Sequence, residues 1–394
     1  MNIQELLTFD TEDSSELLIK EGLPDLVFAE TDPDKIMTNL VTIYENLGGR
    51  TLSPSDPVYL TFKVIAYGFV AARQRIDYTG KQNLLAYARD SALDHLGVLV
   101  GTSRIGAMYA NTTVQITLSE TRSTATTVPA GTRITAGDNV FFALTKDVII
   151  EPGELTATAI ATCQTPGTVG NGYLPGQIKT IVDNVAFVKS IINTDISSAG
   201  AEKEVDDSFR ERIHLAPESF SSAGPSGAYK YHALSANSGI VDIYVEAPED
   251  RSGSRPGEVD IYVLMEGGQL PNASVLEEVR LKCDDKSVRP LTDKVNVKAP
   301  TKKPFNFAAT YYIAKSKETT QGSIQLAVTE AVNDYIVWQR SKMGRDIEPT
   351  ELIYRMRAAG AKRVEPAFVH TVVANNEIAW ANNQMITYGG LEDD

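Results

Sequence analysis

The fold of this chain is decided by residues 200–233, which have the sequence GAEKEVDDSFRERIHLAPESFSSAGPSGAYKYHA. The stretch opens with acidic residues, and carboxylates favour a helix N-terminus because of its free N–H groups and its dipole. We therefore expect a short helix to begin near Asp207. A loop rich in Ser, Gly and Pro follows it. Pro225 suits the first turn of a second helix, where its missing N–H costs nothing, so the stretch predicts a helix–loop–helix.

The same stretch contains acids, arginines and histidines, but not at the spacing that an active site needs. It has no G-x-x-x-x-G-K-[ST] phosphate loop and no G-x-S-x-G nucleophile turn. His214 and His232 form no H-E-x-x-H zinc pair, and neither His95 nor His370 has a second ligand at metal spacing. We predict no catalytic residue, no metal and no cofactor. A carboxylate pair for glycoside cleavage stays open, because such pairs come from distant segments.

The composition is that of a folded protein with several domains. The 394 residues exceed one ordinary domain, and 42% hydrophobic with 22% charged residues is typical of globular chains. The net charge of −14 argues against nucleic acid or an anionic membrane as a partner, since both require Lys and Arg. Two cysteines cannot build a disulfide framework, so we expect folding in a reducing compartment. The first residues, MNIQELLTFDTED, do not resemble a signal peptide.

Residues 1–110 form the predicted helical region. Asp32-Pro33-Asp34 and Ser55-Asp56-Pro57 are helix-start signals, and a third helix is expected over 82–96. The second helix is apolar on most sides from Val58 to Ala72, yet it is too short and too polar to cross a bilayer. Such a helix must be central to its domain or pack against another chain. The side chains that we assign to packing against another chain are Phe62, Ile65 and Phe69.

The rest of the chain divides into three predicted domains. Residues 111–195 alternate apolar and polar side chains in short segments between Gly and Pro turns, which indicates a β-sandwich or small barrel. Residues 196–303 hold the helix–loop–helix, a predicted hairpin of 241–246 with 259–264, and a helix followed by a strand. Residues 304–394 show the order strand, helix, helix, strand, strand. The predicted fold class is multidomain α+β, with an N-terminal helical region, a central β-sandwich-like domain and C-terminal small α/β sandwich domains.

Within the last domain the pattern predicts a long helix over 322–340. One stripe of that helix should face the core, and it contains Ile324, Ala327, Ala331, Tyr335 and Trp338. The last two strands should flank a turn at Asn375-Asn376.

Motifs in chain order resemble the baseplate J family of contractile phage tails and related injection machines. In the opening stretch they are Gly200-Ala201, Glu204, Asp206, the run Phe209-Arg210-Glu211-Arg212-Ile213, Ala223-Gly224 and Tyr229. Elsewhere they are Leu96-Gly97 to Arg104, residues 128–133, Pro166-Gly167 with Gly170-Asn171, Gly239 to Val245, and Gly257 to Val263. The order of these motifs, rather than any single one, makes the resemblance specific.

The resemblance implies a structural subunit and not an enzyme. Such a protein is a baseplate wedge component that forms the inner ring around the tail hub and rearranges when the sheath contracts. The implied partners are other copies of itself, a small wedge protein similar to a sheath initiator, a protein similar to tail protein I, and the hub, with no nucleic acid and no membrane. The implied location is the virion, after assembly in the host cytoplasm. Besides the three apolar side chains of the second helix, the candidate interaction residues are Arg210, Arg212 and Tyr229.

One alternative belongs to another functional class. A tail-associated protein that binds or cleaves host-surface carbohydrate, such as a depolymerase, would also suit the β-rich middle and the 16 tyrosines. Adhesins and depolymerases usually carry long β repeats, and the sequence shows none. The pattern does not distinguish a phage tail from a bacteriocin or another injection particle.

Overall fold

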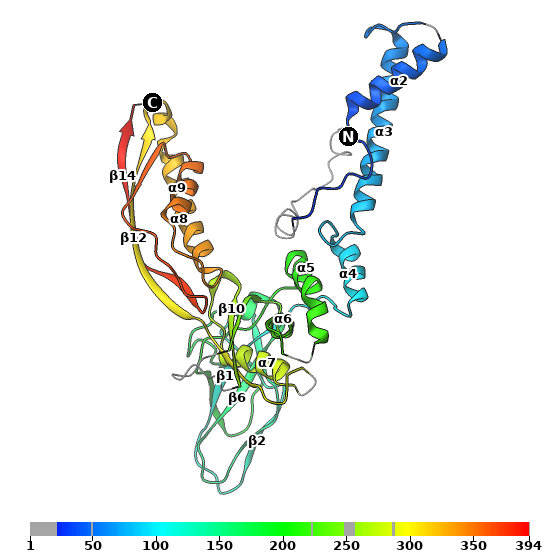
Figure 1. The fold of residues 1–394 in the computed structure, drawn as a ribbon. Coiled ribbons are helices and arrows are strands. Elements are labelled where there is room, and N and C mark those ends of the chain that lie inside the picture. Colours follow the sequence, from blue (N-terminus) through cyan, green and yellow to red (C-terminus); the bar gives the residue numbers. More distant parts are fainter. Residues whose placement is uncertain (1–21, 49, 222–223, 248–256, 286–287, 394) are drawn as a thin grey trace. The chain divides into compact units, whose positions relative to one another are not determined.

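The computed structural model describes residues 22–48, 50–221, 224–247, 257–285 and 288–393. The chain divides into two compact units, residues 1–103 (unit 1) and residues 104–394 (unit 2). Figure 1 shows the ribbon coloured from blue at the N-terminus to red at the C-terminus.

The described part of unit 1 is helical, with α2 (Pro33–Gly48), α3 (Pro57–Lys81) and α4 (Asp90–Leu99). Both predicted start signals are confirmed. Pro33 opens α2, and the Asp56 side chain caps α3 by accepting a hydrogen bond from the Val58 N–H at 2.8 Å. The two helices share a small apolar core, which is made by Ile36, Met37, Ala66 and Val70 with Leu40, Val41, Tyr59 and Phe62 around them.

The predicted helix over 82–96 is wrong at both ends, since α4 begins at Asp90 and continues to Leu99. The Gln82 side chain accepts a hydrogen bond from the Arg89 N–H at 2.9 Å. The N–H groups of Leu84 and Tyr87 donate to carbonyls three residues earlier, as in turns. These local bonds satisfy the backbone between α3 and α4 without a helix.

Unit 2 begins with a curved antiparallel sheet whose strand order is β7-β3-β4-β6-β1-β8. Its strands are β1 (Tyr109–Leu118), β3 (Arg133–Thr135), β4 (Phe141–Leu144), β6 (Thr156–Pro166), β7 (Thr180–Ile181) and β8 (Val188–Asn193). A separate ribbon pairs β2 (Thr126–Val128) with β5 (Val148–Ile150), and η1 (Thr168–Gly170) is a short 3-10 turn.

The sheet nearly closes into a barrel at Asn193. Its N–H donates to the Ile178 carbonyl at 3.1 Å, and its side-chain oxygen accepts from the Ile178 N–H at 2.9 Å. The alternating burial along β1 confirms the predicted period of two, because inward residues such as Val114 and Ile116 are fully buried. A single apolar core fills the interior.

Helices and a mixed sheet follow the barrel. They are α5 (Asp206–Leu215), η2 (Ala216–Phe220), α6 (Ser226–Leu234), β9 (Ile240–Glu246), β10 (Glu258–Met265), η3 (Glu266–Gly268), α7 (Ala273–Cys283) and β11 (Lys294–Lys298). The helix–loop–helix and the β9–β10 hairpin are confirmed, and β11 adds in parallel to β10. The tip of the hairpin, residues 248–256, lies outside the described residues. Side chains of α6 and α7 pack on the sheet to form a second core.

A three-stranded sheet and two helices complete unit 2. The elements are β12 (Thr301–Ala314), η4 (Lys315–Thr320), α8 (Gln321–Arg340), α9 (Pro349–Ala358), β13 (Arg363–Pro366) and β14 (Glu377–Glu392). The predicted turn at Asn375-Asn376 is confirmed directly before β14, but the two strands that flank it do not pair with each other. They lie on opposite sides of β12, with β13 antiparallel and β14 parallel to it.

The buried stripe of α8 also differs from the prediction. The buried residues are Ile324, Val328, Val332, Tyr335 and Gln339. Ala327 and Ala331 lie one position away from the two buried valines and are only half-buried. The longer apolar side chains occupy the core because they bury more surface than alanine does.

The α+β multidomain class is confirmed, with helices first and a nearly closed central sheet. The finer division at 110/111, 195/196 and 303/304 stays a prediction.

Candidate interaction surface

The opening stretch of the sequence builds a buried ion pair between Glu204 and Arg212. The Arg212 Nε and Nη2 atoms donate to the two carboxylate oxygens of Glu204 at 2.6 and 2.7 Å. Only 2% of the Glu204 side chain and 4% of the Arg212 side chain are exposed. Glu204 also accepts from the Ile105 N–H at 2.9 Å, and Arg212 donates to the Ser235 hydroxyl at 3.0 Å. The pair therefore ties the entry to unit 2 to α5 and to the end of α6.

A second arginine secures the same entry segment. Arg104 donates to the Glu204 carbonyl at 2.9 Å and forms an ion pair with Asp206 at 2.7 Å. Its guanidinium lies 4.8 Å from the centre of the Phe209 ring, and the Arg212 guanidinium lies 5.5 Å from that centre. Cations near an aromatic ring gain from its quadrupole, and more so when they are desolvated. Phe209, which is fully buried, therefore packs beside both cations.

The residues just before Glu204 fit against the barrel without spare room. A Cβ on Gly200 would lie 2.4 Å from the Gly167 carbonyl oxygen and 2.9 Å from the Asn171 side chain. Ala201 bridges to Met108 in an isolated antiparallel pair. Glu202 accepts from the Thr168 N–H at 2.9 Å and so caps η1. Gly200, Ala201 and Glu202 thus each contact the barrel domain through a different group.

Tyr229 anchors α6 in the second core. Its hydroxyl donates to Asp293 at 2.8 Å, and burial together with that carboxylate raises the pKa of the phenol above its usual range. Its carbonyl lies 3.9 Å from the Cys283 sulfur. Burial raises the pKa of the Cys283 thiol to about 12, so the thiol stays protonated and unreactive at neutral pH.

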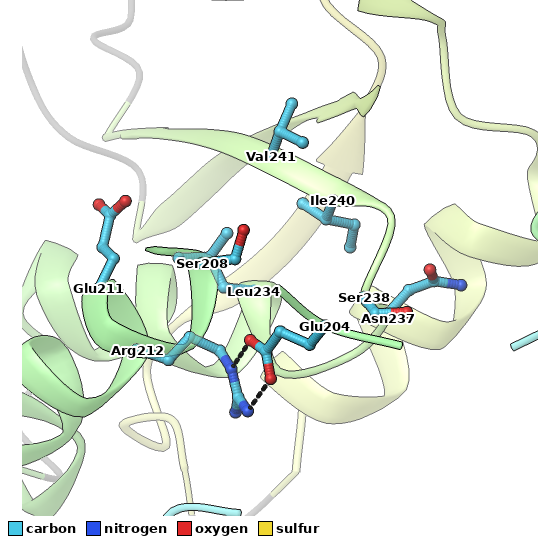
Figure 2. Close-up of a pocket in the computed structure, with 9 residues that line it drawn as sticks. All are labelled: Glu204, Ser208, Glu211, Arg212, Leu234, Asn237, Ser238, Ile240 and Val241. Carbon is cyan, nitrogen blue, oxygen red and sulfur yellow. Dashed lines mark hydrogen bonds and ion pairs between the residues drawn. The ribbon is translucent and has the colours of Figure 1, made fainter. Parts of the chain in front are cut away.

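A small hollow lies beside the buried ion pair, between α5 and the start of β9. Figure 2 shows Arg212 and Glu204 at its floor, with Ser208 and Leu234 close by and Ile240 above. Its volume is about 20 Å³, enough for one water molecule. It is much too small for a sugar or a cofactor.

In unit 1, by contrast with the buried ion pair, α3 leaves apolar side chains exposed to solvent. The face of α3 that carries Ala66 and Val70 is covered by α2, but two apolar rows remain exposed. Row 1 consists of Leu60, Val64 and Tyr67, and row 2 consists of Ile65, Phe69, Ala72 and Ile76. Their spacings of four and three residues follow the heptad rule of helices that pack side by side. The described residues therefore do not enclose α3.

The predicted interaction residues fall into two groups. Ile65 and Phe69 are exposed in row 2, whereas Phe62 is half-buried and its ring lies 5.4 Å from that of Tyr44 in α2. Arg210, Arg212 and Tyr229 are buried inside unit 2. Arg210 forms an ion pair with Asp207 of its own helix. A role for all six residues in contacts with other chains stays a prediction.

Among the described residues, no group of three or more His, Cys, Asp or Glu side chains is placed to bind a metal ion. No helix within the described ranges is long and apolar enough to cross a membrane.

Comparison with known protein families gives three matches in chain order. The Baseplate J-like N-terminal domain matches residues 54–110, the Baseplate J-like protein barrel domain residues 113–200, and the Baseplate J-like central domain residues 221–299. The chain belongs to the baseplate J family. The N-terminal match covers α3 with both apolar rows, and the barrel match covers the nearly closed sheet from the middle of β1 onward. Residues 300–394 of this baseplate J protein lie outside all three matches.

Two curated proteins are similar in sequence to part of this chain. Baseplate protein J of Escherichia phage P2 is 29% identical over 204 residues, which are 51% of this chain and 65% of that protein. Phage-like element PBSX protein XkdT of Bacillus subtilis is 30% identical over 125 residues, 32% of this chain and 31% of that one. The matched segments thus span less than two thirds of either relative. The match to baseplate protein J, together with the family matches, supports a component of a tail baseplate.

A solved structure resembles the chain only loosely. A chain in the cryo-EM structure of the anti-feeding prophage (AFP) baseplate aligns over 88% of this chain and 90% of its own length. The TM-score is 0.36 and the identity 12%, too low to establish a shared arrangement of domains.

Proposed function

We propose that this baseplate J protein is a structural wedge component of a contractile tail or tail-like particle, and not an enzyme. In this proposal it forms the inner ring around the tail hub and rearranges when the sheath contracts. Its partners are further copies of itself, a small wedge protein similar to a sheath initiator, a protein similar to tail protein I, and the hub. It functions in the tail baseplate of a particle that assembles in the host cytoplasm. The ordered family matches over three domains carry the proposal.

The exposed rows of α3 support a role in assembly. A helix that leaves Val64 and Phe69 in water gains free energy when a partner covers them, at roughly 25 cal/mol per Å² of apolar surface buried. Residues 64 and 65 are about 100° apart around the helix, so the two rows face different directions. One partner helix cannot cover both rows. We therefore infer that α3 packs against two helices of other chains in a wedge bundle.

Substitutions in the two rows test the bundle. Val64→Glu in row 1 and Phe69→Asp in row 2 should each prevent incorporation of the chain into particles, because each buries a charge in an apolar contact. The free chain should keep its circular dichroism and melting temperature, since both side chains are exposed. Thr42→Glu, an exposed change in α2 and so outside both rows, is the matched control and should assemble normally. Normal assembly of both row variants would exclude the bundle.

Phe62→Asp should behave differently from the row variants. Its ring packs on Tyr44 within unit 1, so the charge should unfold the α2–α3 core as well as prevent assembly.

Immunogold electron microscopy of intact tails tests where this chain lies in the particle. Label confined to the baseplate, on extended and on contracted tails, is expected, and label at fibre tips would contradict the wedge role.

The carbohydrate-binding alternative gains no support from the site. The hollow beside Arg212 holds about one water molecule, and the charged groups beside it are already paired with each other. A binding assay of the free chain on host cells and on their surface glycans should therefore show no specific signal.

A further inference from the structure

Residues 23–31 form an irregular segment, here called the strap, that lies against the C-terminal half of α3. The strap precedes α2 and falls outside the three family matches. Polar contacts hold its main chain in place. The Phe28 N–H donates to Asp77 at 2.7 Å, and the Leu26 N–H donates to the Tyr87 hydroxyl at 3.2 Å. The strap is therefore attached through its backbone to α3 and to the turn that follows α3.

The large apolar side chains of the strap remain in water. Phe28 is 50% exposed and Val27 is 66% exposed, and Leu23 and Leu26 are accessible to a similar extent. Burial of apolar surface is the usual means of fixing a segment, yet polar bonds of the backbone fix this one. The apolar side chains are therefore available for a further contact.

The Phe28 ring occupies the place of a side chain that α3 lacks. A Cβ on Gly80 would lie 2.6 Å from Cγ and 2.8 Å from Cδ2 of this ring. No other residue fits at position 80 while the ring stays where it is. Glycine is a poor residue inside a helix, since alanine favours the helix more. Helix stability is thus lower at Gly80, and the ring lies directly on the helix surface in return.

Position 80 continues row 2 of α3. Gly80 follows Ile76, the last member of row 2, by four residues, so the two positions are neighbours on the same side of the helix. Ile76 is 57% exposed and Phe69 of the same row is 48% exposed. The Phe28 ring therefore extends the exposed apolar row by one turn, beyond the point where row 2 itself ends.

The charges of the strap are acidic. Its only charged residues are Asp25 and Glu30. Glu30 forms an ion pair with Lys35 at 2.7 Å, whereas the Asp25 side chain is 71% exposed with Lys81 3.9 Å away. A second copy of this chain lying parallel would bring the same acids beside these ones. A helix that carries Lys or Arg beside its apolar stripe is the better complement, because flanking charges select the partner of a packed helix.

We propose that the strap forms an interface with another protein, in which Phe28, lying on Gly80, is the last apolar layer of the contact between row 2 and an amphipathic helix with a basic flank. That helix belongs to a different baseplate protein. This interface rests on the proposed function in that a helix of another chain must cover row 2. It adds a residue outside α3 to the contact, and it fixes how far along α3 the partner helix extends.

Photocrosslinking in assembled particles tests what covers the ring. With p-benzoylphenylalanine in place of Phe28, irradiation should join this chain to one other baseplate protein, at peptides of a helix that has an apolar stripe and basic residues beside it. The same group in place of Thr42, which is exposed on α2 outside the strap and both rows, is the matched control and should give little product. Crosslinks to a second copy of this chain, or equal yields from the two positions, would overturn the proposal.

Two variants remove the ring from the contact in different ways. Phe28→Ser deletes the ring but keeps the N–H that donates to Asp77, and Gly80→Ala displaces the ring while favouring the helix. Each should lower incorporation into particles at least about tenfold, as expected for an aromatic side chain in an interface. Neither should lower the melting temperature of the free chain. Because Phe28→Ala removes the clash, Phe28→Ala/Gly80→Ala should assemble as well as Phe28→Ala alone.

The outcomes separate the strap from the proposed function. Normal incorporation of Phe28→Ser and Gly80→Ala, when Val64→Glu and Phe69→Asp prevent assembly, would refute the role of the strap and leave the bundle standing. Normal assembly of all four variants would refute both. If Phe28→Ser lowers the melting temperature of the free chain, Gly80→Ala decides, because alanine does not weaken the helix.

Discussion

The buried pair of Glu204 and Arg212 leads to a quantitative prediction. Replacing Arg212 with Met removes the cation but leaves the Glu204 carboxylate in a site that is 2% exposed. Breaking a buried ion pair by removing one partner costs about 3 to 5 kcal/mol, because the remaining charge has lost both its partner and its water. The Met side chain keeps much of the packing against Phe209, so most of the loss should come from the charge.

An exposed ion pair with the same two-bond geometry provides a control for the effect of burial. Arg280 also binds its carboxylate partner, Glu277, through two hydrogen bonds of 2.7 Å, but the side chains are 41% and 53% exposed. Exposed pairs are worth about 0 to 1 kcal/mol. Arg280→Met should therefore have a small effect even though it removes an equivalent pair of hydrogen bonds, together with a contact to Asp284.

Hydrogen exchange followed by mass spectrometry measures the difference locally. The amides of Glu204 and Phe209 donate to backbone carbonyls of Ile105 and Val205, so peptides covering them report on this junction. A loss of 3 kcal/mol should accelerate their exchange at least about a hundredfold, since each 1.36 kcal/mol is a factor of ten. Arg280→Met should change the same peptides less than about fivefold.

The double variant Glu204→Gln/Arg212→Met completes the test. Without the stranded carboxylate, it should be less destabilised than the sum of the two single variants, with a coupling of about 2 to 3 kcal/mol. Additive effects, or an Arg212→Met variant no faster in exchange than Arg280→Met, would refute the claim that burial makes this pair important.

Other predictions concern single sites. Gly200→Ala should destabilise unit 2 by about 1 to 3 kcal/mol in calorimetry, because its Cβ would meet the Gly167 carbonyl, whereas Gly106→Ala, with open space around it, should be neutral. Hydrogen bonds from Arg133 lower the pKa of Asp183 to about 2, so this carboxylate stabilises the fold above about pH 4 and loses that effect as the pH falls toward 2. Melting temperatures of Asp183→Asn should therefore fall less between pH 5 and pH 2 than those of the natural chain. Because the pKa of the Cys283 thiol is raised to about 12, a thiol reagent at pH 8 should label it only at the rate of unfolding.

Local sequence signals predicted helices and strands correctly where a single residue or a simple alternation decides the structure. The cap at Asp56 and the acidic start of α5 predict helices that the structure contains. The alternation along β1 and β12 predicts strands for the same reason, since each has one buried face. The failures arise where local patterns are ambiguous. Ala327 and Val328 begin adjacent rows of α8, and only the volume of the core decides which row is buried.

The contacts of the buried ion pair could not be predicted from such local sequence signals. Glu204 precedes α5 by two residues, so its contact with Arg212 depends on how the extended segment turns back along the helix. Helical spacing alone suggests partners three or four residues apart, as for Arg210 with Asp207. The open edge of β14 is likewise a property of strand order, since a sequence that alternates correctly does not reveal whether its strand is central or at an edge.

The strand order also explains how the outer edge of β14 can stay unpaired within the described residues. β12 lies between β13 and β14 and is covered by α8 and α9 through Phe307, Tyr311 and Ile313, so the sheet is complete as a fold without any partner for β14. Stability therefore does not require the exposed stretch Asn382–Met385 to be uncharged. Lysines there would protect the edge at almost no cost to folding, as they do on β11. The uncharged stretch is therefore not a requirement of this domain's own folding.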